Sequence, residues 1–248
     1  MSKLEELAPK HRIGFVSPAG SGDYGSYVFY RLVPRDVMIL HANLGLQEYS
    51  KDGVETAIAN FFHCADELAR GGAEIIVQAG IPVAAQLGRP RVLELLRQVE
   101  ERYGVAAQSN FESVIAGMNH LGVKTLTVGS RWPDELNNAV RAYLAHAGIE
   151  VLAITSRGQW AKEAFGMTLE EGMAMAVELG REAVRLAPQA DGVLLPGGAW
   201  ISVHAIPMTE EASGKPTFTN LQSMTWQALR RLGTGLPIRG WGRLLEAP

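Results

Sequence analysis

Cysteine is nearly absent from this chain of 248 residues, which contains only Cys64. A disulfide within the chain needs two cysteines, and cysteine-based metal sites need more than one. The sequence therefore excludes both, and a single thiol is typical of a protein kept in a reducing compartment. The first twelve residues contain no apolar stretch of the signal-peptide type. We expect a cytoplasmic protein.

Charge of one sign and long apolar runs are also missing. The chain has 23 Lys and Arg against 26 Asp and Glu, so it offers no basic surface for nucleic acid or an anionic membrane. Its apolar runs fall far short of the roughly 20 residues that span a bilayer. Walker A, HExxH and GxSxG motifs are absent, as are clusters of metal ligands. We expect no nucleic-acid partner, no membrane partner, no metal and no cofactor.

Short apolar segments alternate with segments of helical periodicity along the whole chain. Strands are expected at residues 13–17, 37–42, 74–80, 105–108, 125–130, 151–155, 192–198 and 216–219. Helices are expected at residues 54–70, 91–103, 111–121, 133–147, 168–186, 201–212 and 222–232. Apolar strands alternating with helices predict an α/β fold, in which helices cover both faces of parallel sheets.

The same order of elements occurs twice. The strand at residues 13–17 matches residues 126–130, and the segment 74–80 matches residues 191–197, at nearly the same offset. This repeat predicts two pseudo-symmetric halves that share a cleft. We assign residues 1–115 and 215–248 to the first half and residues 116–214 to the second.

Four strand ends are rich in glycine, serine or proline, and each is followed by a helix. Ligands in open parallel sheets bind beyond the carboxyl ends of the strands, where helix N-termini attract anions. A small carboxylate is the simplest ligand for such a cleft, although ordinary strand–helix turns have the same composition. The expected substrate-binding residues are Ser17, Pro18, Asn43, Gly80, Ile81, Ser130, Arg131, Trp132, Gly197, Gly198 and Trp200. Asn220 and Gln222, after the last strand, could also bind a polar group or cap a helix.

Several segments together resemble a known family. They are IGFVSP, ANLGLQEYS, LGVKTLTVGSRWPDELNNAV, DGVLLPGGAWISVHAIP and GWGRLL. They are similar to the aspartate/glutamate racemase superfamily, and most of all to its branch of arylmalonate decarboxylases and maleate isomerases. This resemblance implies two Rossmann-like halves around one site that works without a cofactor.

The resemblance also locates the residues that carry the chemistry in relatives. Racemases and isomerases of the superfamily use one cysteine in each half, and the decarboxylase keeps one of them. The two cysteine positions match Gly80 and Gly197 in this chain. The hydroxyl side chains that bind a carboxylate in the decarboxylase match Ile81 and Pro82, and its tyrosine in the third loop matches Trp132. The resemblance therefore implies a related cleft without a catalytic thiol.

Another group must then move a proton at carbon. The expected catalytic candidates are Glu48, Glu112 and His204, and further candidates in the loops are Asp23, Tyr24, Tyr27 and Tyr49. Each has a structural alternative. Glu112 can stabilise a helix dipole, His204 can be a packing residue, and Glu48 can be a surface charge.

Three functions are compatible with these features. The first is a cofactor-independent lyase or isomerase of a small carboxylic acid with a thiol-free mechanism. The second is a hydrolase or ring-opening enzyme for a small amide or heterocycle, with water activated by Glu48, Glu112 or His204. The third is a non-catalytic protein that binds a small carboxylate. Related folds commonly form homo-oligomers, so self-association is possible in each case.

Overall fold

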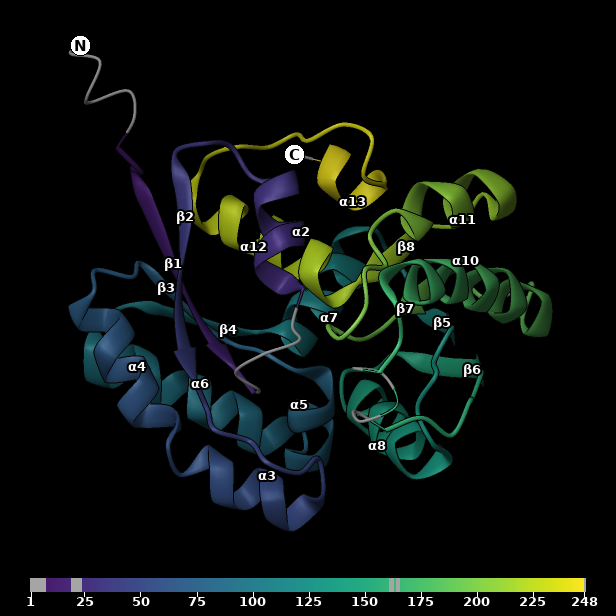
Figure 1. The fold of residues 1–248 in the computed structure, drawn as a ribbon. Coiled ribbons are helices and arrows are strands. Elements are labelled where there is room, and N and C mark those ends of the chain that lie inside the picture. Colours follow the sequence, from purple (N-terminus) through teal and green to yellow (C-terminus); the bar gives the residue numbers. More distant parts are fainter. Residues whose placement is uncertain (1–7, 19–23, 161–162, 164–165, 248) are drawn as a thin grey trace.

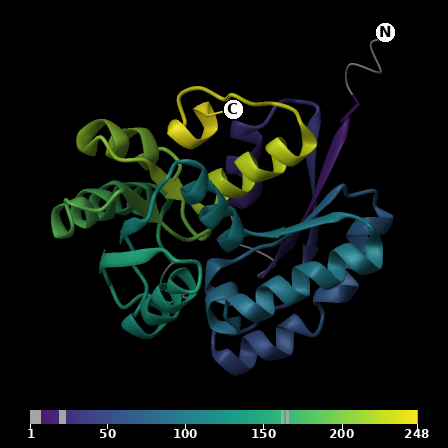
Figure 2. The same cartoon turned by 180° about the vertical axis from the view of Figure 1, so that it is seen from behind.

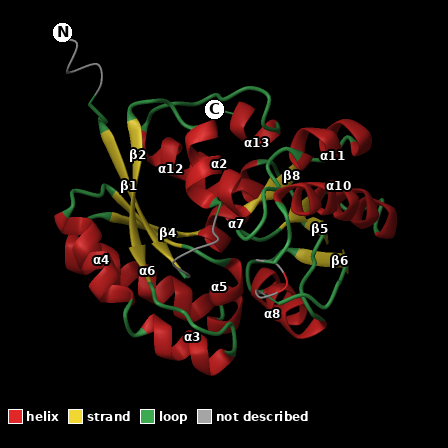
Figure 3. Cartoon of the chain, viewed as in Figure 1, coloured by secondary structure: helices red, strands yellow, loops and turns green. Residues whose placement is uncertain are grey.

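The computed structural model describes residues 8–18, 24–160, 163 and 166–247. These residues form two four-stranded parallel sheets with the same strand order, β2-β1-β3-β4 and β6-β5-β7-β8. Helices surround both sheets (Figures 1 and 3). The expected α/β fold with two pseudo-symmetric halves is confirmed.

The first sheet consists of β1 (His11–Ser17), β2 (Val37–Asn43), β3 (Ile75–Gln78) and β4 (Ala106–Ser109). Its helices are α2 (Gly25–Leu32), α3 (Lys51–Ile58), α4 (Phe61–Arg70), α5 (Ile81–Leu87), α6 (Arg89–Tyr103) and α7 (Asn110–His120). The helix expected over 54–70 is divided, because the chain turns at Asn60, whose N–H donates to the carbonyl of Ala57. The short helices α2 and α5 were not expected.

The second sheet consists of β5 (Thr125–Val128), β6 (Glu150–Ile154), β7 (Gly192–Leu195) and β8 (Thr217–Thr219). Its helices are α8 (Asp134–Ala145), α10 (Leu169–Leu186), α11 (Ala205–Ser213), α12 (Asn220–Leu232) and α13 (Arg243–Glu246). As expected, Thr168 and Glu171 form a capping box at the start of α10. Strands β3 and β7 are buried along their whole length, as central strands covered on both faces should be.

The division between the halves differs from the expected one at two points. Strand β8 pairs with β7 and belongs to the second sheet, although residues 215–248 were assigned to the first half. The expected boundary at residues 115/116 also falls inside α7. Strand β8 follows β7 directly through α11 and is the counterpart of β4, so its place follows from the repeat of strand order.

Helices α7 and α12 pack against each other where the two halves meet, and Figure 2 shows this contact from behind. Each of them directly follows the last strand of its half, β4 or β8. At the same junction, the rings of Phe111 on α7 and Tyr143 on α8 stack with centroids 4.2 Å apart. Both rings are buried, so this aromatic pair joins the halves through apolar contact.

Every helix in the described ranges is too short or too polar to cross a bilayer.

Replacement of Phe111 tests the contribution of this junction. Phe111→Ala removes a fully buried ring and leaves a cavity against Tyr143, so the free energy of unfolding should fall by about 3–5 kcal/mol. Urea unfolding followed by circular dichroism measures the change. The control is Leu93→Ala on α6, where the side chain is 41% exposed and the expected change is within about 0.5 kcal/mol. Equal effects of the two substitutions would contradict this account of the junction.

Candidate active site

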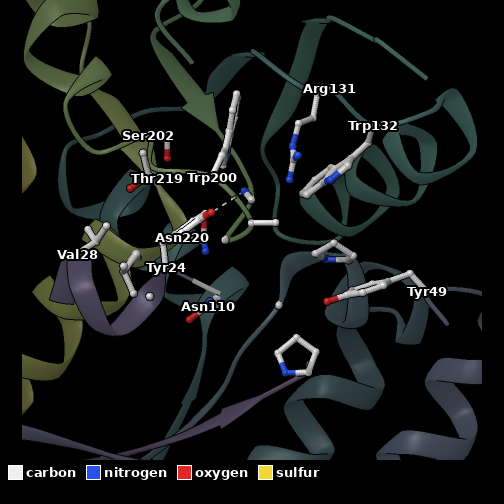
Figure 4. Close-up of a pocket in the computed structure, with 18 of the residues that line it drawn as sticks. Tyr24, Val28, Tyr49, Asn110, Arg131, Trp132, Trp200, Ser202, Thr219 and Asn220 are labelled. Carbon is white, nitrogen blue, oxygen red and sulfur yellow. Dashed lines mark hydrogen bonds between the residues drawn. The ribbon is translucent and has the colours of Figure 1, made fainter. Parts of the chain in front are cut away.

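A cavity lies between the two halves, beyond the carboxyl ends of their strands (Figure 4). Both halves contribute to its wall, and most of the contributing residues are apolar or aromatic. The lining includes Phe15, Pro18, Tyr24, Val28, Tyr49, Gly80, Pro82 and Asn110 from the first half, and Arg131, Trp132, Leu136, Trp160, Gly197, Gly198, Trp200, Ser202, Thr219 and Asn220 from the remainder of the chain. The cavity occupies the position that the repeat predicts for a shared cleft.

Gly80 and Gly197, the two glycines for which the resemblance implies cysteine positions, both line this cavity. Gly80 follows β3 with φ 91°, and Gly197 follows β7 with φ 124°. These backbone conformations strongly favour glycine. A Cβ at Gly80 would lie 3.0 Å from Cγ of Pro18, and a Cβ at Gly197 would lie 3.0 Å from Nε1 of Trp200. Both turns are thus shaped for glycine, and a neighbouring side chain closes in on each.

Arg131 brings an unusual charge into the cavity. The residue is only 2% exposed, and its Nε and Nη1 have no hydrogen-bond partner among the described residues. Burial lowers the pKa of Arg131 to about 10, which leaves the guanidinium protonated at neutral pH. A buried cation without an anion is costly, and a carboxylate is the group that best matches a guanidinium.

Trp200 lies beside this guanidinium and adds a third donor. Its ring centroid is 5.0 Å from Cζ of Arg131, and its buried Nε1 is also without a partner in the described part of the chain. Nη2 of Arg131 would lie 3.5 Å from a Cβ at Gly197. We call Arg131 Nε, Arg131 Nη1 and Trp200 Nε1 the open donors. The guanidinium of Arg131 and Trp200 Nε1 thus both lie beside the turn at Gly197.

Two asparagines occupy equivalent places in the two halves. Asn110 is the first residue of α7 and Asn220 the first residue of α12, and both line the cavity. The Asn220 Oδ1 accepts a hydrogen bond from the backbone N–H of Gly197 at 3.1 Å, so this side chain braces the glycine turn. The Asn110 Oδ1 is buried and finds no partner within the described ranges. We call it the open acceptor.

Seven of the eleven expected substrate-binding residues line the cavity. They are Pro18, Gly80, Arg131, Trp132, Gly197, Gly198 and Trp200. The other four, Ser17, Asn43, Ile81 and Ser130, are not part of the lining.

Three of these four residues have other structural roles. The Ser130 Oγ donates to Asn137 Oδ1 at 2.7 Å and accepts from the N–H of Trp132. The Asn43 Oδ1 accepts from the N–H of Gly45 at 2.8 Å, which stabilises a local turn. Ile81 packs in the hydrophobic core.

None of the three expected catalytic residues lies in the described lining. Glu112 forms a two-point ion pair with Arg89, with N–O distances of 3.0 and 3.1 Å. His204 donates from Nε2 to the carbonyl of Met173 at 3.0 Å. Glu48 is exposed on its loop. Glu112 is held in an ion pair, His204 is hydrogen-bonded to the backbone, and Glu48 is a surface charge.

The remaining loop candidates have different outcomes. Tyr24 and Tyr49 line the cavity. Tyr27 is exposed and accepts hydrogen bonds from Arg31 on the same helix. Asp23 lies outside the described residues.

Asn110 was not predicted from the sequence, although Asn follows Ser or Thr at both junctions that lead from the last strand of a half into a helix. Comparison of the two repeats could have found it.

Two features bear on cofactors. The described residues contain no group of three or more His, Cys, Asp and Glu side chains that could hold a metal ion.

The sequence GSGDYG at residues 20–25 has the GxGxxG spacing of dinucleotide sites, and residues 20–23 lie outside the described ranges. That fingerprint also needs an acidic residue at the end of the second strand, where β2 has His41, Ala42 and Asn43. The glycine spacing is therefore a weak signal for a dinucleotide.

Comparisons with known proteins agree with this fold. A curated relative, the arylmalonate decarboxylase of Bordetella bronchiseptica, is 27% identical over 217 residues, which cover 87% of this chain and 89% of the relative. Among solved structures, a liganded arylmalonate decarboxylase with one glycine changed to cysteine and one cysteine to serine superposes with a TM-score of 0.87 at 24% identity. That match covers 96% of this chain and all of the other.

A maleate cis-trans isomerase from Nocardia farcinica superposes with a TM-score of 0.82 at 19% identity, over 96% of this chain and 99% of the isomerase. At these identities the superpositions establish a common fold. The family model described as arylmalonate decarboxylase matches residues 13–245, nearly the whole chain. This protein therefore belongs to the arylmalonate decarboxylase family.

Proposed function

We propose that this protein is a cofactor-independent decarboxylase or isomerase of a small carboxylic acid and that it works without a thiol. Family membership supports the reaction class. The observation that carries the site assignment is the buried guanidinium of Arg131, which lines the cavity beside Gly197. A pocket of this kind binds an anion, and its apolar walls suit an organic acid.

Binding would begin with the substrate carboxylate on the open donors. Folding has already removed the guanidinium from water, so the cost of desolvating Arg131 is not paid again when the carboxylate binds. Hydrogen bonds between a guanidinium and a carboxylate are about twice as strong as neutral ones. The indole N–H of Trp200 supplies a further donor to the same anion.

The same donors would stabilise the reaction intermediate. When a carbon–carboxylate bond breaks and releases CO₂, its electron pair remains on carbon and spreads onto the retained carboxylate as an enediolate. Negative charge then grows on oxygen atoms that already contact Arg131. Donors fixed in place before the reaction act most strongly in a site from which water is excluded. Phe15, Val28 and Leu136 supply apolar wall around them.

We assign the proton for carbon to one of the loop candidates, because Glu48, Glu112 and His204 lie outside the described lining. The described part of the lining contains no Asp, Glu, His or Cys, and its O–H acids include Tyr24 and Tyr49. Tyr49 is the better donor, because its phenolate would lie close enough to Arg131 to raise the pKa of the arginine. By reciprocity the guanidinium stabilises the phenolate that remains after donation. Figure 4 shows both side chains directed into the space between the halves.

The position of Tyr49 is held from outside the cavity. Gln86 on α5 donates from Nε2 to the carbonyl oxygen of Tyr49 at 3.0 Å. In the proposed step the phenol O–H bond breaks, the new C–H bond takes up the electron pair left by CO₂, and the phenolate regains a proton from water.

The two alternative functions stand differently. Hydrolysis needs a group that activates water, and Glu48, Glu112 and His204 are outside the described lining. A non-catalytic carboxylate-binding protein would use the same cavity and would return its ligand unchanged. Other properties remain predictions: a small carboxylate as the ligand, a cytoplasmic location and assembly into a homo-oligomer.

A panel of arylmalonates and maleate, followed by NMR in D₂O, tests the reaction and the role of Tyr49. The intact protein should turn over at least one acid and place deuterium on the reacting carbon. Tyr49→Phe should lower kcat by about 10²–10⁴-fold with little change in KM, because only proton transfer is lost. Tyr27→Phe, on an exposed ring, is the matched control and should keep full activity. A panel left unchanged by the intact protein would overturn the enzymatic assignment.

Replacement of the buried arginine separates binding from stability. The pKa of Arg131 lies below its ordinary value, so folding disfavours the protonated form, and this penalty is present at every pH below about 10. Arg131→Met should therefore raise the free energy of unfolding by about 2 kcal/mol, or about 4–8 °C in Tm, and abolish phenylacetate binding.

Scanning calorimetry and isothermal titration measure these two effects. Arg157→Met is the matched control, because Arg157 is paired with Glu178 and Glu182 at the surface. It should leave phenylacetate binding unchanged and should not raise Tm. A less stable Arg131→Met protein that still binds phenylacetate would contradict the proposed role of Arg131.

The single cysteine provides a test of the thiol-free mechanism. Cys64 is 2% exposed, its thiol donates to the carbonyl of Asn43 at 3.3 Å, and burial raises its pKa. A buried protonated thiol is a poor nucleophile. Cys64→Ala should therefore keep kcat within about twofold, and iodoacetamide should not inhibit the folded enzyme. Loss of turnover in a folded Cys64→Ala protein would show that the thiol takes part.

A further inference from the structure

The cavity distinguishes its two ends by the kind of hydrogen bond that each offers. The second half provides the open donors on Arg131 and Trp200, and the first half provides the open acceptor on Asn110. All three residues are at least 97% buried. Buried polar atoms are normally paired, so a set without partners at a cavity wall points to a ligand that supplies them.

Asn110 and Asn220 occupy equivalent positions in the two halves, but only Asn220 uses its Oδ1 in a hydrogen bond among the described residues. Asn220 uses its Oδ1 to brace the N–H of Gly197. Asn110 stands at the same point of the first half, after β4 instead of β8, yet the described residues offer its Oδ1 no such bond. The helix does not need this side chain either, because Ser109 caps α7 by accepting from the N–H of Glu112.

We propose that the substrate is a carboxylic acid that also carries a hydroxyl or N–H group, with the carboxylate on the open donors and the second group on Asn110. This inference rests on the proposed function, because it takes Arg131 as the carboxylate site. The open acceptor is an uncharged amide oxygen, and the group that fits it is a neutral hydroxyl or N–H donor.

A hydroxyl is the simplest group with which to probe Asn110. Its O–H can donate to the amide oxygen of Asn110, the atom that lacks a partner among the described residues. One added hydrogen bond in a buried site changes affinity by about three- to tenfold, and loss of a partner leaves the acceptor desolvated and unpaired.

Isothermal titration with phenylacetate, mandelate and the three monohydroxyphenylacetates tests the proposal. At least one hydroxylated acid should bind the intact protein about tenfold more tightly than phenylacetate. Asn110→Ala should remove this preference while leaving phenylacetate affinity within about twofold. Asn119→Ala is the matched control, since Asn119 is exposed on the same helix, and it should keep the preference. Circular dichroism and Tm confirm that each variant is folded.

The outcomes separate the two proposals. Equal binding of hydroxylated and parent acids, with phenylacetate lost in Arg131→Met, would overturn the role of Asn110 and keep the carboxylate site. A preference that survives in Asn110→Ala would also overturn the role of Asn110. If no acid binds the intact protein, or if binding persists in Arg131→Met, the carboxylate site fails and this inference fails with it.

Discussion

Helix α7 packs against α12 where the two halves meet, and the shared cavity depends on this contact. Each helix begins directly after the last strand of its half, so their contact fixes how the two sheets face each other. The first residues of these helices, Asn110 and Asn220, thereby reach one cavity. Stacking of Phe111 on Tyr143 supports the same junction with buried aromatic area. A shared site follows from this geometry.

Within this symmetric frame the two walls of the cavity carry different chemistry. Gly80 and Gly197 occupy equivalent turns, each with a backbone conformation that favours glycine. Next to the first glycine lies Pro18, whereas Arg131 and Trp200 lie next to the second. The wall of the second half therefore carries a positive charge, whereas the described wall of the first half is uncharged. This asymmetry gives a bound acid one preferred orientation, which a symmetric pair of thiols would not provide.

The buried charge in the cavity also lowers the free energy of unfolding of the protein. Arg131 places a positive charge in a dry site, and the cost of its desolvation is not recovered within the described part of the chain. The surrounding core is large enough to compensate, because strands β3 and β7 and the rings at the junction are fully buried. Sites that bind ligands commonly carry such a cost, which the ligand then offsets.

The α/β alternation, the duplication and the glycine turns could be predicted from the sequence, because these features depend on local composition and periodicity. The sequence also predicted that Arg131, Trp132 and Trp200 line the cleft, since residues after parallel strands converge at one edge of a sheet. Tertiary structure alone decided which loop residues face the cavity. Glu112 forms an ion pair with Arg89, and His204 donates a hydrogen bond to the carbonyl of Met173. The Asn220 Oδ1 accepts from the N–H of Gly197, whereas the Asn110 Oδ1 has no partner among the described residues. This difference depends on segments that are distant in sequence.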